Sequence, residues 1–540
     1  MLTPLSKILI GLVVVGVIGG GLYYLNSNPS VAEKVAPGLT KSKSTATTNT
    51  STSGSTTPVA QRTASNDILV VGMNTWGGQA AGVYMNNGQK ASSTSSKFFT
   101  MFNQQVQIEV TDDFLASREA LKNGAIDVLC FATVGEFSIE AAGLSSDGIK
   151  IYCHYDKSWG GDALVVREGI NSIADLVGKT IALAPGSPSH GLFLNLIRVS
   201  GYTQNQFKIK EVKDGLDAAD VFRKEQVDAA FVWSPDDSKL PHDVRGAKVL
   251  VSTKTAENII WDCMLVKQAT AASKHEAIKN FIAGWLYGSA AINTNKEARA
   301  EAVEGMVTVF GLPKEDWSNL TIAKFMTLGD NLNFFGLNSS YRDVTGEELY
   351  SRMGDEYKNL KLADGSALVS GNPPSWREVA DPVFINELRN DPRLVQHQTA
   401  EVPKVFAAPT PEIANAPAVT TNRVTVEYES GSAELSYEAK RTIKQQFGVL
   451  ARGFTNAYIR VEGNTDNVGS ASLNRALSLR RAESVKAFLV MTYGWQSNKI
   501  IVKGNGFDEQ IAETLYGLSN DSPEGRAKNR RTEFEIVVSR

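Results

Sequence analysis

The stretch "EGNTDNVGSASLNRALSLRRAESV", which runs from Glu462 to Val485, decides the fold of the C-terminal part of this chain. It begins as a polar turn and continues, from about Ser470, with the spacing of an amphipathic helix. Four residues make one side of that helix apolar: Leu477, Val485, Phe488 and Leu489. Asn474 and Arg481 fall within this same side. Because arginine is almost never buried unpaired, Arg481 needs an internal carboxylate or an anionic ligand.

Two interpretations of Arg481 are open at this point. Asp466 lies in the turn just before the helix, and a plain salt bridge between Asp466 and Arg481 would satisfy both charges. Alternatively, both side chains line a pocket that a charged ligand enters. Strand-like runs at 423–428, 458–462, 499–506 and 530–538, with a further helical run at 436–453, predict an α+β domain over 423–540.

The motifs of this domain resemble a known family. "GNTDNVGSASLNRALSLRRAESVKAFL", with "GSAEL" before it and "EGRAKNRRTEFEI" after it, is similar to the peptidoglycan-binding domain shared by OmpA, MotB and Pal-type proteins. The resemblance implies that Asp466 and Arg481 bind the ammonium and the carboxylate of diaminopimelate in the wall peptide. It also implies supporting roles for four further residues: Thr465, Asn474, Asn529 and Arg530.

The region 67–395 alternates strand and helix signals, as α/β folds do. It contains a weak internal repeat. Both Ala120–Thr133 and Val221–Pro235 show the pattern of a helix end, a turn, an aspartate and a strand. The two aspartates are Asp127 and Asp228. Two similarly built α/β lobes predict a cleft between them, where ligands gather near the carboxyl ends of strands.

Polar and aromatic residues follow several of these predicted strands. The candidates for lining the cleft are Trp76, Asp112, Ser187, Ser189, Trp233 and Asp262. A serine before a helix is often only a cap and a tryptophan often only packs, so each residue also has a structural explanation. Their joint occurrence at strand ends favours the interpretation as a binding site.

"INSIADLVGKTIALAPGSPSHGLFLNLIRVSGYT", Ile170 to Thr203, resembles the second-lobe opening of periplasmic solute-binding proteins of the nitrate, sulfonate and taurine transport type. The resemblance implies a two-lobed type II periplasmic-binding fold that closes on a small solute. The ligands of that family are mostly small anions. The aspartates and tryptophans of this chain would equally suit a cation or a zwitterion, so the solute class stays open.

The N-terminus predicts a membrane anchor. "ILIGLVVVGVIGGGLYYL", Ile8 to Leu25, is uncharged and close to the length that spans a bilayer. A cleaved secretory signal, with "PSVA" as the cleavage site, is the alternative. We expect residues 1–7 in the cytoplasm, a Ser/Thr-rich linker over 26–66 and a semi-rigid Pro/Ala linker over 396–422.

The composition excludes several classes of function. The chain has 540 residues and a net charge of -3, without a basic run or an RNA-binding signature, so we expect no nucleic-acid partner. The five histidines are scattered, and no nucleophile–base arrangement or metal-ligand spacing is present. We therefore expect no metal, no cofactor and no enzymatic activity. The three cysteines are expected to be free and buried rather than paired.

Together these features predict an inner-membrane protein, crossing once, with most of the chain in the periplasm. It would bind peptidoglycan and either a small solute or a protein partner, and a membrane-protein partner is left open. One alternative is a MotB-like stator or a scaffold of an envelope complex, although Ile8–Leu25 lacks the acidic residue that carries ions. Another is the substrate-binding component of an ABC importer.

Overall fold

The computed structural model describes residues 68–317, 320–358, 360–361, 365, 367–369, 372–395, 399–402, 404–426, 428–429 and 431–538. The predicted span Ile8–Leu25 and the linker 26–66 lie outside these residues. Within the described part, no helix is long and apolar enough to cross a membrane.

The first sheet has six strands in the order β11-β4-β10-β3-β1-β2. Their bounds are β1 Leu69–Met73, β2 Val106–Val110, β3 Val128–Cys130, β4 Ile149–Ser158, β10 Trp261–Lys267 and β11 Ala323–Phe325. Strands β2, β1 and β3 are parallel, while β10 runs antiparallel to both β3 and β4. We call this sheet and its helices lobe 1.

The second sheet has five strands in the order β7-β6-β8-β5-β9. Their bounds are β5 Asp162–Val166, β6 Thr180–Leu183, β7 Lys208–Glu211, β8 Ala229–Trp233 and β9 Lys248–Ser252. Strands β7, β6 and β8 are parallel and β5 is antiparallel to β8. This lobe 2 therefore repeats the arrangement of lobe 1: three parallel strands with the first in the middle, then one antiparallel strand.

The repeat found in the sequence has a structural cause. In lobe 1, Asp127 precedes β3 and its Oδ2 accepts the Val70 N–H of β1 at 3.0 Å. In lobe 2, Asp228 precedes β8 and its Oδ2 accepts the Thr180 N–H of β6 at 2.8 Å. Each aspartate thus links two neighbouring parallel strands, β3 to β1 in lobe 1 and β8 to β6 in lobe 2. This shared contact confirms the two similarly built lobes.

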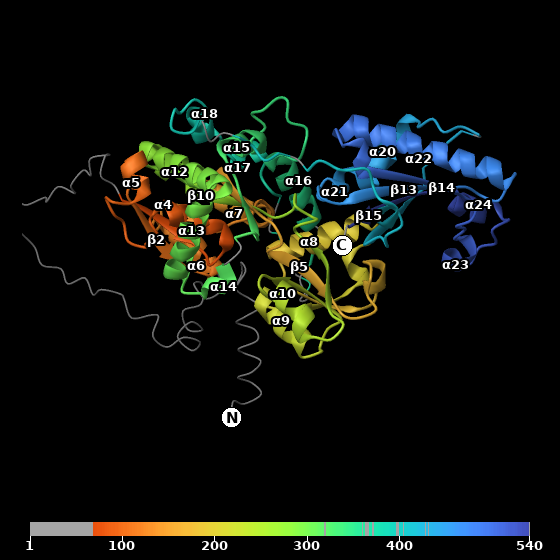
Figure 1. The fold of residues 1–540 in the computed structure, drawn as a ribbon, viewed down its shortest axis with the longest axis horizontal. Helices are drawn as coiled ribbons and strands as arrows, with labels where there is room; N and C mark the ends of the chain where they lie inside the picture. The colour runs from red at the N-terminus through yellow and green to blue at the C-terminus, as the bar shows by residue number, and fades with distance from the viewer. Residues whose placement is uncertain are drawn as a thin grey trace, which may run out of the picture. The chain divides into compact units, whose positions relative to one another are not determined.

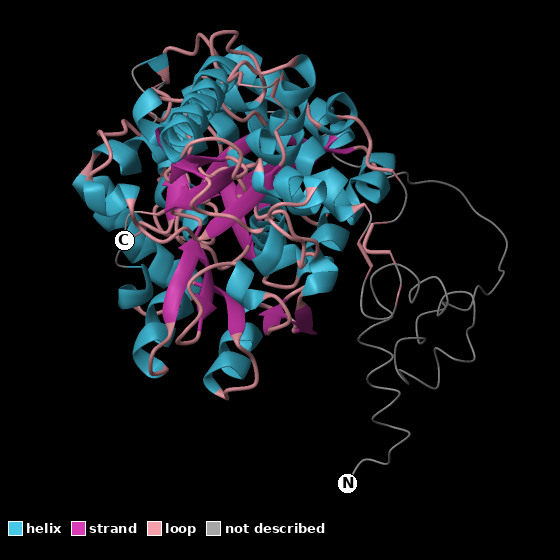
Figure 2. Ribbon diagram, turned by 90° about the vertical axis from the view of Figure 1, so that its right-hand side faces the viewer, coloured by secondary structure: helices cyan, strands magenta, loops and turns pink. Residues whose placement is uncertain are grey.

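Helices surround the two sheets, as Figure 2 shows. In lobe 1 they are α4 Ala80–Met85, α5 Lys97–Phe102, α6 Phe114–Asn123, α7 Val134–Ser146, α11 Gln268–Ser273, α12 His275–Thr294, α13 Lys296–Phe310, α14 Lys314–Trp317, α15 Leu328–Phe334, α16 Gly346–Tyr357, α17 Trp376–Val379 and α18 Val383–Leu388. In lobe 2 they are α8 Pro188–Val199, α9 Gly215–Arg223 and α10 Asp236–Asp243. The three cysteines, Cys130, Cys153 and Cys263, are buried and free, as expected.

The C-terminal domain contains a four-stranded sheet in the order β12-β15-β13-β14. Its elements are β12 Thr420–Val424, α20 Tyr437–Ile443, the π-helix Lys444–Gly448, α21 Val449–Ala451, β13 Tyr458–Asn464, α22 Ala471–Tyr493, β14 Ile500–Gly506, α23 Ala512–Tyr516, α24 Pro523–Asn529 and β15 Thr532–Val537. Strand β12 begins three residues before the predicted domain start at 423. Figure 1 shows α22 lying along β13 and β14.

Helix α22 approaches this sheet closely because two strand positions are glycine. A Cβ at Gly463 of β13 would come within 2.2 Å of the Ser478 backbone oxygen. A Cβ at Gly504 of β14 would come within 2.5 Å of the Leu479 backbone nitrogen. The inner face of α22 therefore packs directly on the backbones of β13 and β14.

The Pro/Ala segment packs on the folded chain, which differs from the expected spacer. Phe406 is buried against Tyr458 and Ile501 of the C-terminal domain, and the short helix α19, Pro411–Ala414, follows it. The Arg460 guanidinium donates to the Ala414 carbonyl at 2.9 Å. A Pro- and Ala-rich composition predicts stiffness, but Phe406 within the segment packs on partners that only the fold supplies.

The chain crosses between the lobes twice, at Trp159–Gly161 and at 253–260. Glu257, in the second crossing, is buried, and its carboxylate pairs with Lys324 at 2.9 Å and with Lys157 at 3.8 Å. Both lysines belong to lobe 1, and Lys157 immediately precedes the first crossing. One carboxylate therefore links the two crossings.

The same carboxylate also contacts the C-terminal domain. Glu257 Oε2 accepts hydrogen bonds from Asn456 Nδ2 at 2.7 Å and Thr455 Oγ1 at 3.1 Å. Glu401, which follows lobe 1, pairs with Lys157 at 3.4 Å and with Lys324. Burial alone would raise the pKa of Glu257, but the two lysines outweigh it and lower that pKa to about 2.

We expect Glu257→Gln to lower the free energy of unfolding at pH 7 by about 3 kcal/mol, because a pKa of about 2 instead of 4.5 stabilises the folded state by that order. A lowered pKa stabilises above the ordinary value of 4.5, and this contribution is lost as the pH falls toward 2. Urea unfolding at pH 7 and at pH 3 measures both effects.

Glu304→Gln is the matched control, since Glu304 pairs with Lys314 on the surface, where both side chains are 61% exposed. This variant should unfold nearly as the parent does. Equal unfolding of all three proteins at pH 7 would contradict a stabilising role for Glu257.

Candidate ligand-binding sites

Arg481 lies on the inner face of α22, as the helical projection predicted, and only 8% of it is exposed. Its Nε donates to the Ser432 carbonyl at 3.0 Å, and its guanidinium lies over the Tyr428 ring at 4.5 Å. Among the described residues it forms no ion pair. Burial lowers the pKa of Arg481, and the nearby charge of Asp466 only partly offsets this.

The Asp466 carboxylate pairs with a different arginine. Its Oδ2 accepts Arg530 Nη1 at 2.7 Å, and its Oδ1 accepts the Val468 N–H at 3.2 Å. The plain Asp466–Arg481 salt bridge, the structural alternative from the sequence, is therefore not what the structure contains. The charge of Asp466 raises the pKa of Arg481 electrostatically, but no carboxylate in the described part of the chain forms an ion pair with Arg481.

The other predicted residues of this region have separate roles. Asn474 Nδ2 donates to the Val468 carbonyl at 2.9 Å and so holds the turn that carries Asp466. Thr465 is buried, and its Oγ1 has no hydrogen-bond partner among the residues that the structure describes. Asn529 is fully buried, and its Oδ1 accepts the N–H groups of Ile511 and Ala512 at 2.9 and 3.1 Å. Asn529 is therefore a structural support of α23, not a residue that faces Arg481.

A second group of charged side chains lies where the lobes meet. Asp156, near the end of β4, stands opposite Asp262 of β10 in the strand register. Asp156 is fully buried and Asp262 is 8% exposed. The indole Nε1 of Trp76, which follows β1, donates to Asp156 Oδ2 at 2.8 Å. Two predicted cleft residues, Trp76 and Asp262, thus meet at an aspartate that the sequence analysis did not select.

Lobe 2 contributes a matching set. Asp162, the first residue of β5, is 4% exposed and accepts hydrogen bonds from Ser158 and Ser189, each at 2.9 Å. The Trp233 indole Nε1 in turn donates to Ser189 Oγ at 3.0 Å. The predicted Ser189 and Trp233 are therefore joined through Asp162, which is also a residue that the prediction missed. We call Asp156, Asp162 and Asp262 the junction carboxyls.

Two predicted cleft residues lie outside this group. Asp112 is exposed and accepts the Thr75 N–H at 2.7 Å and the Thr75 hydroxyl at 2.9 Å, so it fastens one loop to another. Ser187 caps α8 by accepting the His190 N–H at 3.3 Å. For these two residues the structural explanation is sufficient.

A repeated tripeptide would have indicated the missed aspartates. Trp-Gly-Gly occurs at 76–78 and again at 159–161, between Asp156 and Asp162. A Cβ at Gly78 would overlap the Asp156 carboxylate, and a Cβ at Gly161 would lie 2.2 Å from the Trp76 ring. The two glycine pairs therefore let the loops interlock, which brings Trp76 against Asp156 at the first crossing.

The junction carboxyls hold protons more tightly than ordinary aspartates. Burial raises the pKa of Asp156 to about 6, although the hydrogen bonds from Asp262 and Trp76 lower it. Burial likewise raises the pKa of Asp162 to about 6, although the hydroxyls of Ser158 and Ser189 oppose it. Burial, followed by the charge of Asp156, raises the pKa of Asp262 far above its usual range. Near neutral pH, Asp156 and Asp262 therefore share a proton.

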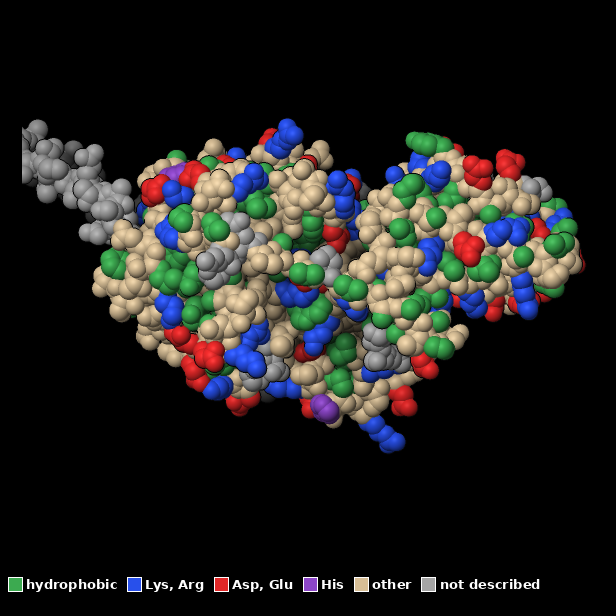
Figure 3. All heavy atoms as spheres, turned by 45° about the horizontal axis from the view of Figure 1, so that its top comes forward, with side chains coloured by type: hydrophobic (Ala, Val, Ile, Leu, Met, Phe, Trp, Pro, Cys, Tyr) green, Lys and Arg blue, Asp and Glu red, His purple; other side chains and the backbone are tan. Residues whose placement is uncertain are grey.

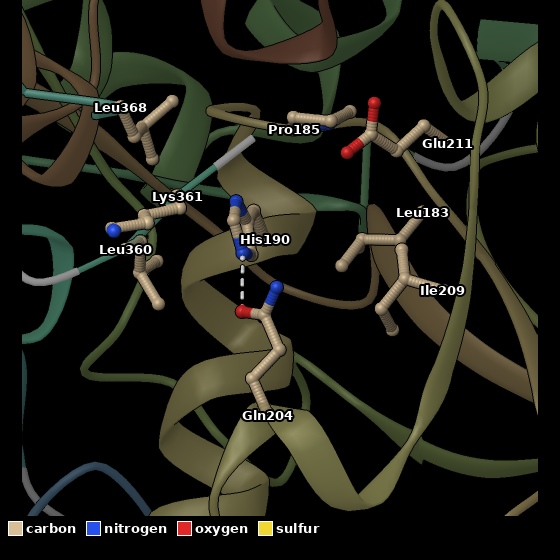
Figure 4. Close-up of a pocket in the computed structure, with 9 residues that line it drawn as sticks. All are labelled: Leu183, Pro185, His190, Gln204, Ile209, Glu211, Leu360, Lys361 and Leu368. Atoms are coloured by element: carbon tan, nitrogen blue, oxygen red, sulfur yellow. Dashed lines mark hydrogen bonds between the residues drawn. The ribbon is translucent and has the colours of Figure 1, made fainter. Parts of the chain in front are cut away.

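The structure also has a small pocket in lobe 2, which Figure 4 shows. It is lined by Leu183, Pro185, His190, Gln204, Ile209, Glu211, Leu360, Lys361 and Leu368. Its cavity of about 10 Å³ admits roughly one water molecule. Burial lowers the pKa of His190 to about 4, so the ring that points at Gln204 is neutral. This pocket is too small for a solute and lacks the junction carboxyls.

Comparison with known families covers both parts of the chain. The model of the OmpA family matches residues 427–530, which include Asp466, Arg481 and Arg530. The C-terminal domain is an OmpA-family domain. The model described as NMT1/THI5 like matches residues 149–298, which include the junction carboxyls and lobe 2. Both resemblances expected from the sequence are confirmed at this level.

Two curated relatives each match less than a fifth of this chain. Outer membrane protein A of Bordetella avium is 44% identical over 100 residues, which are 18% of this chain and 48% of that protein. Peptidoglycan-binding protein ArfA of Mycobacterium tuberculosis is 43% identical over 84 residues, 16% of this chain and 23% of that protein. The chain thus spans less than half the length of these relatives.

Two solved structures are similar to part of this chain. The periplasmic aliphatic sulphonate binding protein SsuA of Escherichia coli has a TM-score of 0.42 and 18% identity, covering 54% of this chain and 92% of that chain. The periplasmic nitrate-binding protein NrtA of Synechocystis has a TM-score of 0.45 and 10% identity, covering 61% and 90%.

We expect Asp162→Asn to stabilise the empty protein at pH 8 by about 3 kcal/mol, because it removes a buried charge from a site whose pKa is about 6 instead of 3.8. A raised pKa stabilises the fold below the ordinary value, and this contribution is lost as the pH rises through about 6. The advantage of the variant should therefore be largest above pH 6 and should shrink toward pH 4. Urea unfolding across this range tests it, and a destabilised variant at pH 8 would contradict the burial argument.

Proposed function

We propose that this protein is an envelope protein that binds peptidoglycan through its OmpA-family domain and a small solute through its two lobes. The observation that carries the first half is Arg481, a buried guanidinium without a carboxylate partner among the described residues. A ligand carboxylate would pair with the Arg481 guanidinium through the two parallel hydrogen bonds that guanidinium groups favour.

The second charge of the pocket supports the same ligand. Asp466 pairs with Arg530. Because the Arg530 side chain is 46% exposed, it has room to turn away from Asp466 when a ligand binds. An ammonium group would replace or share this ion pair. Diaminopimelate carries an ammonium and a carboxylate on one carbon, so Asp466 and Arg481 together suit it. The Mycobacterium relative described as a peptidoglycan-binding protein supports this assignment.

Solute binding by the two lobes is supported by their construction. Both lobes bring side chains to the junction, and the chain crosses between them beside the junction carboxyls. The NMT1/THI5-like match over residues 149–298 covers both crossings. A protein partner in place of a solute remains the alternative occupant of this cleft.

The proposed location follows from the wall-binding half. Peptidoglycan lies outside the inner membrane, so residues after Leu25 would be periplasmic and Ile8–Leu25 would anchor the chain. The visible face in Figure 3 intersperses acidic and basic side chains, as a soluble periplasmic portion would.

Asp466→Ala and Arg481→Ala should each weaken binding to diaminopimelate-containing sacculi at least tenfold, because each leaves one end of the ligand unpaired. Co-sedimentation of the purified full chain with sacculi at increasing concentration gives the affinity. Sacculi whose stem peptides carry lysine instead should bind the parent protein less well, since they lack the second carboxylate.

Arg475→Ala is the matched control, because Arg475 lies on the same helix with its side chain 64% exposed and pairs with Asp508. It should bind sacculi as the parent does. Parental binding by both Asp466→Ala and Arg481→Ala would refute the wall-binding assignment.

A further inference from the structure

The junction between the lobes concentrates acidic groups, and the described residues bring no matching positive charge to it. The three junction carboxyls come from both lobes and are at most 8% exposed. In the described part of the chain, no lysine or arginine lies within ion-pair distance of any of them, and none is among the main causes of their raised pKa values. Buried charges normally have a partner, because an unpaired one costs several kcal/mol.

We propose that this junction binds an organic cation carrying an amino or ammonium group, rather than an anion. The inference rests on the proposed solute-binding function and names the chemical class of that solute. An ammonium group placed between the lobes would neutralise carboxyls from both and so favour their approach. A sulfonate or nitrate at the same place would be repelled by the same groups.

A shared proton supports a ligand at this point. Asp156 Oδ1 is fully buried and has no N–H or alcohol donor among the described residues, so its donor is the proton that Asp156 shares with Asp262. The other oxygen of Asp156 already accepts the Trp76 indole. An ammonium group carries up to three donors and would satisfy both carboxyls in place of that proton.

The surroundings favour an organic cation over a metal ion. Hydroxyl or indole donors already occupy oxygens of Asp156 and Asp162, whereas calcium requires six to eight free oxygen ligands. Two half-buried indoles, Trp76 and Trp233, lie at the same carboxyls. Tryptophan beside a carboxylate is a combination that suits ammonium groups on an organic skeleton.

The charged groups around the junction reinforce its sign. Glu136 at the start of α7 raises the pKa of Asp262, and Asp237 at the start of α10 raises that of Asp162. Two cations act on these outer acids: Arg118 lowers the pKa of Glu136, and Lys254 lowers that of Asp237. The junction carboxyls are therefore the groups that a cationic ligand would neutralise.

The test is thermal unfolding of the full-length chain in a nonionic detergent, followed by tryptophan fluorescence at constant ionic strength. The cationic probes are butylamine, putrescine and choline as chlorides, the anionic probes are sodium methanesulfonate and sodium nitrate, and magnesium and calcium chloride form the metal arm. We expect at least one organic cation to raise Tm by on the order of 2 °C or more, and the anions to have no effect. The shift should be larger at pH 8 than at pH 5, because the cation binds ionised carboxyls.

Asp162→Asn should lose most of this shift while remaining folded. Asp147→Asn, at an exposed aspartate that ends α7, should keep it. A shift that persists in Asp162→Asn would place the cation elsewhere and overturn the assignment.

The remaining outcomes separate the inference from the function on which it rests. Stabilisation by methanesulfonate or nitrate alone would refute the cation and leave solute binding intact. Stabilisation by magnesium or calcium alone would refute the organic cation. No stabilisation by any probe would refute both the inference and solute binding by the lobes, and would favour a protein occupant.

Discussion

The arrangement of this molecule depends on the buried carboxylate of Glu257. It holds Lys157 beside the first crossing between the lobes and Lys324 in lobe 1, and it accepts hydrogen bonds from Thr455 and Asn456 of the OmpA-family domain. Because two lysines and two neutral donors satisfy it, this charge can be buried at a net gain. Glu257 therefore ties both crossings to the C-terminal domain.

The two candidate sites show the opposite situation. Arg481 is buried with one backbone acceptor and an aromatic ring, and the junction carboxyls are buried with indole and hydroxyl donors. In both sites the described residues supply neutral contacts but no countercharge within ion-pair distance. Unpaired buried charge is costly, so both places suit the charged ligands proposed for them.

Glycines make both sites possible. Gly463 and Gly504 let α22 rest on the backbones of β13 and β14, which brings Arg481 over the end of the sheet near Asp466. Gly78 and Gly161 let the two Trp-Gly-Gly loops interlock, which brings Trp76 to Asp156. In each case a missing side chain sets how closely two elements approach, and that distance determines which charges meet.

The sequence by itself determined the two α/β lobes, the α+β C-terminal domain and the inward position of Arg481, because periodicity and local motifs depend only on neighbouring residues. It also identified Ser189, Trp233, Trp76 and Asp262, which stand at strand ends. Only the tertiary structure decided that Asp466 pairs with Arg530, that Asp156 meets Trp76 and Asp162 meets Ser189, and that the Pro/Ala segment packs on the folded chain. These contacts join residues far apart in the chain, and their partners follow from packing, which no local pattern encodes.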